Sequence, residues 1–436
     1  MLDNITRQIK GLFYGWRMVA VGAVIRMLGG GFHLYGFTVF FLPITQELGL
    51  TRAATSLAFS LARAEGAIEG PLAGFLIDRF GPRPLMLIAV AISGIGYMLL
   101  STVHGYYAFL AIYLCVISLS FSAGFMHSPM VLANTWFIRR RALAMTLISA
   151  SIGIGGTLIT PLLAYAVYTW GWRRGALLAG IGLIATGIPV ALLVKRSPES
   201  MGLRPDGDPA GGQLEIHRAG ANREVSAEEA ATMETSFTVW EAMRTPAYWM
   251  FVVATIARVA AYNSITVHFI PIMVWKGLSE QRGAALLAAM ALMSLPSHLL
   301  VGWIADFVHK PRLMAISMAL GLVALFCLAV GEAEWTLWLF TLLFTFVEAI
   351  FPVSWATIGD FYGRKYFGTI RGSMSFFYLW GAAIGPVGAG MIYDRYQSYA
   401  PMMSILMTLF LLATCLYFLL VRPQPPRPAN AGQSGS

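Results

Sequence analysis

Long apolar stretches separated by short polar segments make up most of this chain. A helix needs about 20 apolar residues to cross the hydrocarbon core of a bilayer, and twelve stretches of that kind occur. They start near Trp16, Ala53, Leu85, Tyr107, Ala142, Gly175, Tyr248, Gly283, Leu313, Leu337, Phe367 and Met402. The pattern predicts an all-α integral membrane protein with twelve transmembrane helices.

Two related signatures, 228 positions apart, divide the chain into equivalent halves. They read Gly74-Phe-Leu-Ile-Asp78-Arg79-Phe-Gly81-Pro-Arg83 and Gly302-Trp-Ile-Ala-Asp306-Phe-Val-His309-Lys310-Pro-Arg312, and each closes an apolar segment. The repeat predicts two pseudo-symmetric six-helix halves. The expected units are an N-terminal bundle (1–195), a polar cytoplasmic linker (196–245), a C-terminal bundle (246–422) and a disordered tail (423–436). Within the linker we expect a short amphipathic helix around 237–243, before Pro246 opens helix 7.

Composition and charge support the membrane assignment. With 57% hydrophobic and 12% charged residues, 436 residues cannot form one soluble core with a polar coat. The net charge of +9 reflects topology: 19 Lys and Arg fall in segments on the side of the N-terminus and six in segments on the other side. The excess predicts that both termini are cytoplasmic. We expect a multi-pass protein of the plasma (inner) membrane, with no nucleic-acid partner.

Cysteine usage gives no sign of a metal or a disulfide framework. Cys115, Cys327 and Cys415 fall inside predicted helices, and the sequence has no CxxC motif or Cys/His cluster. The glycine-rich runs follow no strand and lack the phosphate-binding pattern. We therefore expect no metal, no cofactor and no enzymatic activity.

Together, the two signatures resemble the loop motif of the major facilitator superfamily, and this resemblance extends over essentially the whole chain. It implies a fold in which two six-helix halves rock around a midplane site. It also implies that each aspartate faces the positive N-terminus of helix 11 or helix 5, while nearby arginines bind carboxylates and helix ends. The gating residues predicted from this resemblance are Asp78, Arg79, Arg83, Asp306, Arg139 and Arg364.

A second motif narrows the resemblance to one branch. Trp136-Phe137-Ile-Arg139-Arg140-Arg141-Ala-Leu143-Ala144 is similar to the entry of helix 5 in monocarboxylate transporters, and the bacterial oxalate/formate antiporters are close relatives of that group. The usual carboxylate-binding and proton-coupling residues differ. Tyr35 stands where those carriers have a lysine, and Ser294 and His298 stand where they have an aspartate and an arginine.

Charged residues inside the predicted helices indicate a polar central route, because each costs a few kcal/mol at mid-depth unless it is paired or faces water. Arg26 and Glu69 lie at matching depth in the first half, and Arg258 and Glu348 lie at matching depth, about 18 Å from the cytoplasmic helix ends, in the second. Each couple is close enough in depth to pair. The substrate-binding residues predicted are Arg258, Arg26, Tyr35 and His298, and those for proton coupling are His298, Glu69 and Glu348.

The sequence thus predicts a secondary active transporter for a small, monocarboxylate-like organic anion, working by alternating access. The predicted partners are that anion, a coupled proton and the lipid bilayer, and the protein is expected to be a monomer. Two alternatives stay open: an efflux carrier for amphipathic compounds, and a non-transporting membrane receptor with the same fold. Helix 5 reads Gly156-Thr-Leu-Ile-Thr160-Pro161 and lacks the full Gly-x-x-x-Gly-Pro element of exporters, which disfavours efflux.

Overall fold

The computed structural model describes residues 13–50, 52–207, 214–218, 221–225, 237–331 and 333–424. Apart from one short hairpin, the described residues in regular elements are helical. The predicted disordered tail lies outside the described residues, except for its first two positions.

The first six membrane helices form one bundle, called the N half. Helix 1 comprises α2 (Tyr14–Leu28), a π-helical segment (Gly29–Leu34) and α3 (Thr38–Glu47). Helices 2 and 3 are α4 (Arg52–Phe80) and α5 (Pro82–Leu100). Helix 4 comprises α6 (Tyr106–Ile112), α7 (Leu119–Phe121) and α8 (Ser128–Trp136), joined by π-helical segments Tyr113–Ser118 and Ser122–His127. Helices 5 and 6 are α9 (Arg141–Trp170) and α10 (Trp172–Leu192).

The last six helices form the C half. Helix 7 comprises α13 (Pro246–Val267) and α14 (Phe269–Trp275), helix 8 is α15 (Glu280–Ile304), and helix 9 is α16 (Lys310–Val330). Helix 10 comprises α17 (Glu334–Ala349) and α18 (Phe351–Tyr362). Helices 11 and 12 are α19 (Phe367–Tyr396) and α20 (Ala400–Phe418). Eleven spans among the described residues are long and apolar enough to cross a membrane. The twelfth long helix, α4, is too charged to meet that criterion, since it carries Arg63, Glu65, Glu69, Asp78 and Arg79.

The linker contains more regular structure than its polar composition predicts. Two 3-10 turns, Glu199–Met201 and Pro205–Gly207, follow helix 6. Strands β1 (Leu214–Arg218) and β2 (Ala221–Val225) form an antiparallel hairpin in which Ile216 pairs with Arg223. The expected short helix is α12 (Val239–Met243), and a capping box between Thr238 and Glu241 stabilises its start. Pro246 is the first residue of α13, as predicted.

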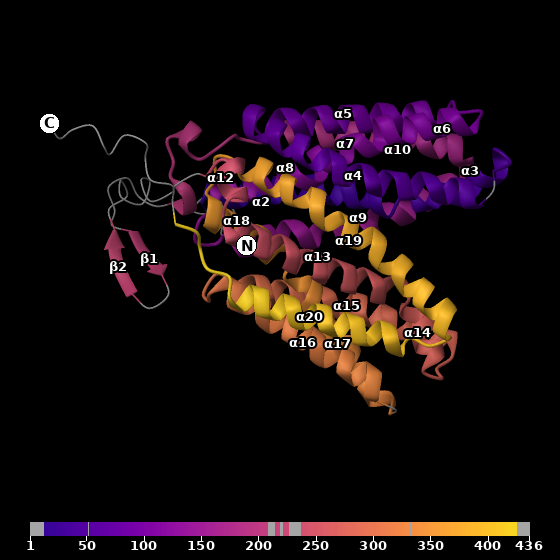
Figure 1. The fold of residues 1–436 in the computed structure, drawn as a ribbon. Helices are drawn as coiled ribbons and strands as arrows, with labels where there is room; N and C mark the ends of the chain where they lie inside the picture. Colours follow the sequence, from indigo (N-terminus) through magenta and orange to yellow (C-terminus); the bar gives the residue numbers. More distant parts are fainter. Residues whose placement is uncertain are drawn as a thin grey trace, which may run out of the picture.

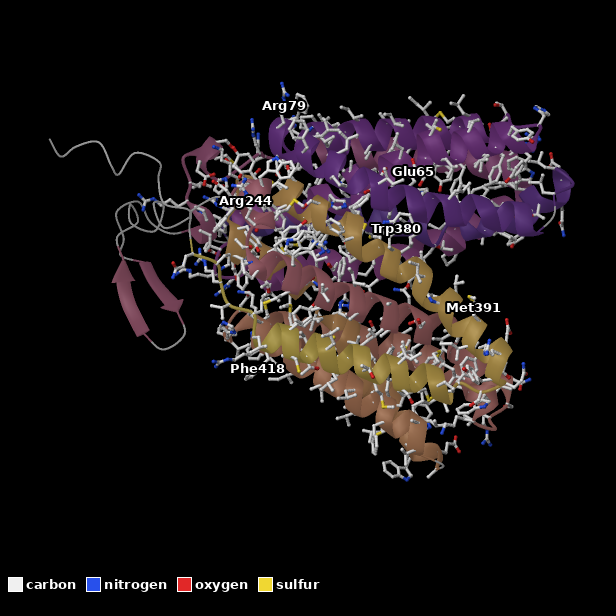
Figure 2. The ribbon with its side chains drawn as sticks, viewed as in Figure 1. Glu65, Arg79, Arg244, Trp380, Met391 and Phe418 are labelled. Atoms are coloured by element: carbon white, nitrogen blue, oxygen red, sulfur yellow. The ribbon has the colours of Figure 1, made fainter. Side chains whose placement is uncertain are left out.

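Figure 1 shows the two halves in contact at one end and diverging toward the other. The start of α2, the end of α20, α12 and the β1–β2 hairpin lie at the end where the halves meet, which we call the linker end. The opposite end, with α3, α6 and α14, is called the far end. Figure 2 shows Arg79 and Arg244 at the linker end, and Glu65 inside the N half.

Glycines allow α4 and α19 to pack closely across the two halves. A Cβ on Gly74 would clash with the carbonyl oxygen of Gly368, and one on Gly372 would clash with that of Gly70. Gly81 then ends α4 with a φ of 86°, a left-handed conformation that glycine adopts without strain, and Pro82 begins α5. The first signature thus builds both a tight helix crossing and the turn that follows it.

Candidate functional site

Asp78, at the linker end of α4, binds the first turn of α19 in the other half. Its carboxylate accepts hydrogen bonds from the backbone N–H groups of Gly368 (2.9 Å) and Thr369 (2.7 Å), and from the Thr369 hydroxyl (2.7 Å). An anionic side chain at a helix N-terminus satisfies backbone donors that have no partner within the helix and interacts favourably with the helix dipole. Asp78 therefore joins helices 2 and 11, the geometry that the motif implied.

Asp306 makes the equivalent contact from the C half. It follows the end of α15, and its carboxylate accepts hydrogen bonds from the backbone N–H groups of Ala142 (2.9 Å) and Leu143 (3.0 Å) at the start of α9. Burial raises the pKa of Asp306 to about 6, although the nearby Lys310 ammonium and the two backbone donors act in the opposite direction. We call the Asp78 and Asp306 contacts the paired latch.

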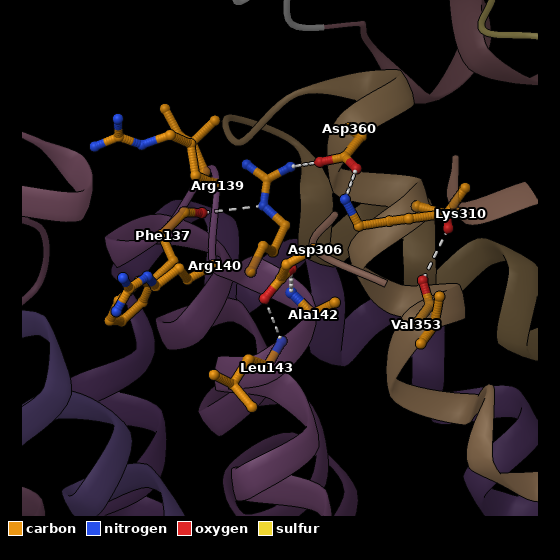
Figure 3. A network of polar contacts seen from close by, with 12 residues as sticks. Phe137, Arg139, Arg140, Ala142, Leu143, Asp306, Lys310, Val353 and Asp360 are labelled. Atoms are coloured by element: carbon orange, nitrogen blue, oxygen red, sulfur yellow. Dashed lines mark hydrogen bonds and ion pairs between the residues drawn. The ribbon is translucent and has the colours of Figure 1, made fainter. Parts of the chain in front are cut away.

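A third contact between the halves passes through Arg141, which the sequence analysis did not single out as a gating residue (Figure 3). The Arg141 guanidinium donates to the Asp360 carboxylate on α18 at 2.7 Å and to the carbonyl oxygen of Phe137 at 3.1 Å. Asp360 also forms an ion pair with Lys310 on α16 at 2.8 Å. The Arg141 side chain is only 2% exposed. Its bonds to Asp360 and Phe137 therefore take the place of the hydrogen bonds to water that the guanidinium would form if it were exposed.

Of the other predicted gating residues, Arg364 joins the halves. Its guanidinium binds the carboxylate of Glu199 in the linker at 3.0 Å and donates to the carbonyl oxygen of Thr135 at 2.9 Å. Arg79 and Arg139 are exposed at the linker end, and Arg83 is half-buried there.

Asp206, in the linker, binds the turn that precedes α9. Its carboxylate accepts hydrogen bonds from the backbone N–H groups of Ile138 and Arg139, both at 2.9 Å, and of Arg140 at 3.4 Å. This residue belongs to the polar linker predicted from the sequence, but spacing along the chain did not reveal its partners. The linker thus holds the turn from which Arg141, Ala142 and Leu143 reach the C half.

Arg258 and Glu348, which sequence depth suggested could pair, form an ion pair. The Arg258 guanidinium lies 2.6 Å from the Glu348 carboxylate, joining α13 to α17. The Arg258 side chain is 1% exposed, whereas that of Glu348 is 30% exposed. The pair therefore has one deeply buried partner and one that is partly accessible.

The expected Arg26 and Glu69 pair is not present among the described residues. Arg26 donates instead to the carbonyl oxygen of Met126 at 2.8 Å, across helices 1 and 4. Glu69 is buried, and neither of its carboxylate oxygens has a hydrogen-bond partner in the described part of the chain. Matching depth was insufficient here because two helices at the same depth can present their side chains in different directions.

The remaining predicted site residues lie on different halves. His298, half-buried on α15, binds the Ser294 carbonyl oxygen through Nδ1 at 2.7 Å. Tyr35 follows the π-helical segment of helix 1, is 44% exposed and packs against Gly156 of α9.

Arg371, on α19, is a buried charge for which the sequence analysis predicted no role. Its guanidinium carbon lies 4.3 Å from the ring centre of Trp355 and 4.6 Å from that of Tyr378. A guanidinium over an aromatic face is stabilised by the ring quadrupole. The signal that could have identified it was the surplus of intramembrane arginines over glutamates in the second half.

In the described part of the chain, no group of three or more His, Cys, Asp or Glu side chains is arranged so that it could hold a metal ion. The polar residues that cross the interface of the halves are helix-end aspartates, ion pairs and buried arginines. An arrangement of two helical bundles with these contacts is typical of a membrane transport protein.

The family model of the Major Facilitator Superfamily matches residues 19–386 and 277–435. The chain belongs to this superfamily. It is 27% identical over 399 residues to monocarboxylate transporter 3 of Rattus norvegicus, covering 88% of this chain and 76% of that one. It is 25% identical over 249 residues to the oxalate:formate antiporter of Oxalobacter formigenes, covering 56% and 52%.

Among solved structures, the fold is similar to that of the Major Facilitator Superfamily transporter FucP. The TM-score is 0.68 at 14% identity, covering 93% of this chain and 99% of that one. These comparisons indicate a transporter and not an enzyme. They agree with the predicted fold of twelve helices in a multi-pass membrane protein.

Proposed function

We propose that the protein is a secondary active transporter for a small, monocarboxylate-like organic anion. The observation that carries this proposal is the position of the polar contacts between the halves. The paired latch, the Arg141–Asp360 ion pair and the Arg364–Glu199 ion pair are all at the linker end, while the ribbons diverge toward the far end (Figure 1). Bundles held together at one end only can rock and expose a central site to each side in turn.

The anion class is supported by two independent facts. Monocarboxylate transporter 3 and the oxalate:formate antiporter are among the relatives. In addition, Arg26, Arg258 and Arg371 are buried within the membrane helices, and Arg is well suited to bind a carboxylate through two parallel hydrogen bonds. In this proposal Arg258, Arg26, Tyr35 and His298 contribute to substrate binding, and His298, Glu69 and Glu348 are the candidates for a coupled proton.

The excess of Lys and Arg on the linker side supports a cytoplasmic linker end and cytoplasmic termini. In this proposal the protein is a monomer in the plasma (inner) membrane, and its far end faces outward. Asp78, Arg79, Arg83, Asp306, Arg139 and Arg364 would act together at the cytoplasmic gate.

Uptake into proteoliposomes tests the proposal. The purified chain is reconstituted and given radiolabelled acetate, lactate and oxalate, with glucose as a neutral comparison and with an imposed pH gradient. We expect saturable uptake of at least one carboxylate, responsive to the pH gradient, and none of glucose. Uptake of glucose without any carboxylate would refute the anion assignment.

A further inference from the structure

Two buried arginines in the membrane region have no carboxylate partner among the described residues. Arg26 is 4% exposed and Arg371 is 1% exposed, and neither forms an ion pair in the part of the chain that the structure describes. Arg26 donates to the Met126 carbonyl oxygen and Arg371 to the Ser375 hydroxyl at 3.4 Å. The Nε group of each arginine has no hydrogen-bond partner among the residues that the structure describes.

Two further buried groups connect these arginines across the halves. His127, beside Met126 in helix 4, has its ring 5.3 Å from that of Trp355 on α18. Trp355 in turn lies against the Arg371 guanidinium. Both rings are buried, and neither Trp355 Nε1 nor His127 Nδ1 has a hydrogen-bond partner within the described ranges. His127 also interacts electrostatically with both Arg371 and Arg26.

The cluster contains an excess of positive charge and of hydrogen-bond donors. An unpaired charge in a low-dielectric interior is costly, and so is a buried donor without an acceptor. Arg258 differs in having a counter-ion, Glu348, although its Nε also has no hydrogen-bond partner among the described residues. Glu69 is a buried carboxylate on α4, and in the part of the chain that the structure describes it forms no hydrogen bond or ion pair with Arg26 or Arg371. The group that would compensate the cluster is an anion with several acceptor atoms.

We propose that Arg371, Trp355, His127 and Arg26 form the binding site for the carboxylate of the transported anion. The proposal deepens the proposed function and depends on it for the identity of the anion as substrate. Arg26 and His127 belong to the N half, and Trp355 and Arg371 belong to the C half. A carboxylate between them is bound by both halves at once, so its binding favours their approach. Arg258 and Glu348 then form a neighbouring internal pair and not the principal contact.

Thermal unfolding of the purified full-length chain in nanodiscs tests this site. Sodium acetate and sodium oxalate are titrated at constant ionic strength, with chloride and sulfate as inorganic controls. A ligand that binds only the folded state raises the unfolding midpoint in proportion to its occupancy. We expect a carboxylate-dependent rise in the native chain. Arg371→Met and Arg26→Gln should each weaken the apparent affinity by about tenfold or more, the effect of losing one charge-assisted contact.

The matched control is Arg282→Gln, which removes an exposed arginine paired with Glu334 and should keep the native response. Without ligand, Arg371→Met should unfold at the native temperature or above it, because it removes an uncompensated buried charge. Misfolding of Arg371→Met, or a clearly lower midpoint, would overturn the proposal by giving Arg371 a structural role. Arg371→Lys keeps the charge but not the planar stacking, and it should retain folding with weakened binding.

The outcomes separate this inference from the proposed function. If the native chain transports a carboxylate and Arg371→Met retains the full carboxylate response, the site is wrong and the transport function stands. If the native chain neither transports nor responds to any carboxylate, the proposed function fails. An equal response to chloride would overturn the assignment of a carboxylate site.

Discussion

Asp78 and Asp306 make the same contact in opposite directions across the protein. Each carboxylate accepts hydrogen bonds from two consecutive backbone N–H groups at the first turn of a helix in the other half, α19 for Asp78 and α9 for Asp306. Asp78 also accepts a third hydrogen bond, from the Thr369 hydroxyl. The two copies of the sequence signature therefore form the same kind of contact. The contact of Asp78 has more hydrogen bonds than that of Asp306.

We expect Asp78→Asn to impair closure of the linker end more than Asp306→Asn. Asparagine keeps one acceptor but loses the charge, which is worth about 1–2 kcal/mol at a well-placed helix N-terminus. Because Asp78 accepts more hydrogen bonds than Asp306, its replacement should destabilise the closed linker end more. Nitroxide labels at Phe80→Cys and Lys365→Cys, which are exposed on opposite halves at the linker end, would report the opening as a longer distance. The three native cysteines are replaced first. An unchanged distance distribution and full transport in Asp78→Asn would rule out the latch.

The Arg258–Glu348 ion pair predicts a rescue of folding without a rescue of transport. Arg258→Ala should lower expression and transport, because it leaves Glu348 in a partly buried site without its cation. Arg258→Lys should weaken transport, because it keeps the charge but loses the planar fork. The double variant Arg258→Ala with Glu348→Gln should recover folding, measured by size-exclusion profile and thermal midpoint. Normal transport by that double variant would make the pair purely structural.

Proton coupling through His298 predicts a specific change in pH dependence. Its Nδ1 is held by the Ser294 carbonyl oxygen, and no hydrogen bond of Nε2 is recorded for the described residues. Imidazole is the side chain that changes charge between about pH 5 and 8. Uptake by the native chain should depend on pH, and this dependence should be lost in His298→Gln. A variant with the native profile would direct attention to Glu69 and Glu348.

The contacts of Asp206 predict that the linker takes part in the gate. Asp206→Asn should loosen the turn at 138–140 and displace Arg141, with a cost of about 0.5–2 kcal/mol as for the loss of a helix cap. The linker-end labels at Phe80→Cys and Lys365→Cys should then show a broader distance distribution. Glu334→Gln, an exposed carboxylate at the far end, is the control for charge removal. If Asp206→Asn and Glu334→Gln give identical distance distributions, the linker takes no part in the gate.

Asp306 also predicts how pH shifts the conformation. In the latched structure burial raises its pKa to about 6, whereas a hydrated aspartate has a pKa of about 3.9. The latched state therefore binds the proton more tightly, and lowering the pH from 7.5 to 5.5 should favour it. A protonated carboxyl keeps acceptor oxygens for the N–H groups of Ala142 and Leu143, whereas the amide NH2 of Asp306→Asn cannot accept a hydrogen bond, so the variant and the protonated residue are not equivalent. Distances between the linker-end labels should shorten over this range in the native chain and less so in Asp306→Asn. Lengthening on acidification would contradict the assignment.

Much of the architecture could be predicted before the structure was known. The two signatures, the positions of twelve apolar stretches and the opening of α13 at Pro246 follow from local rules, because hydrocarbon thickness fixes helix length and proline fixes a helix start. The β1–β2 hairpin was not anticipated, since its polar strands carry no clear alternating pattern. The site was only partly accessible to the same reasoning. Arg258 and Glu348 pair as their depth suggested, but Arg26 and Glu69 do not.

The sequence by itself determined the membrane class, the duplicated halves and which charged residues lie within the bilayer, because these depend on composition and on spacing along a helix. Which of those charges meet was decided only by the tertiary structure. Depth along an axis is one coordinate, whereas the rotation of each helix and the offset between the halves supply the others. For that reason Asp78 binds Thr369, Asp206 binds the turn before α9, and the Arg371 guanidinium lies against the rings of Trp355 and Tyr378.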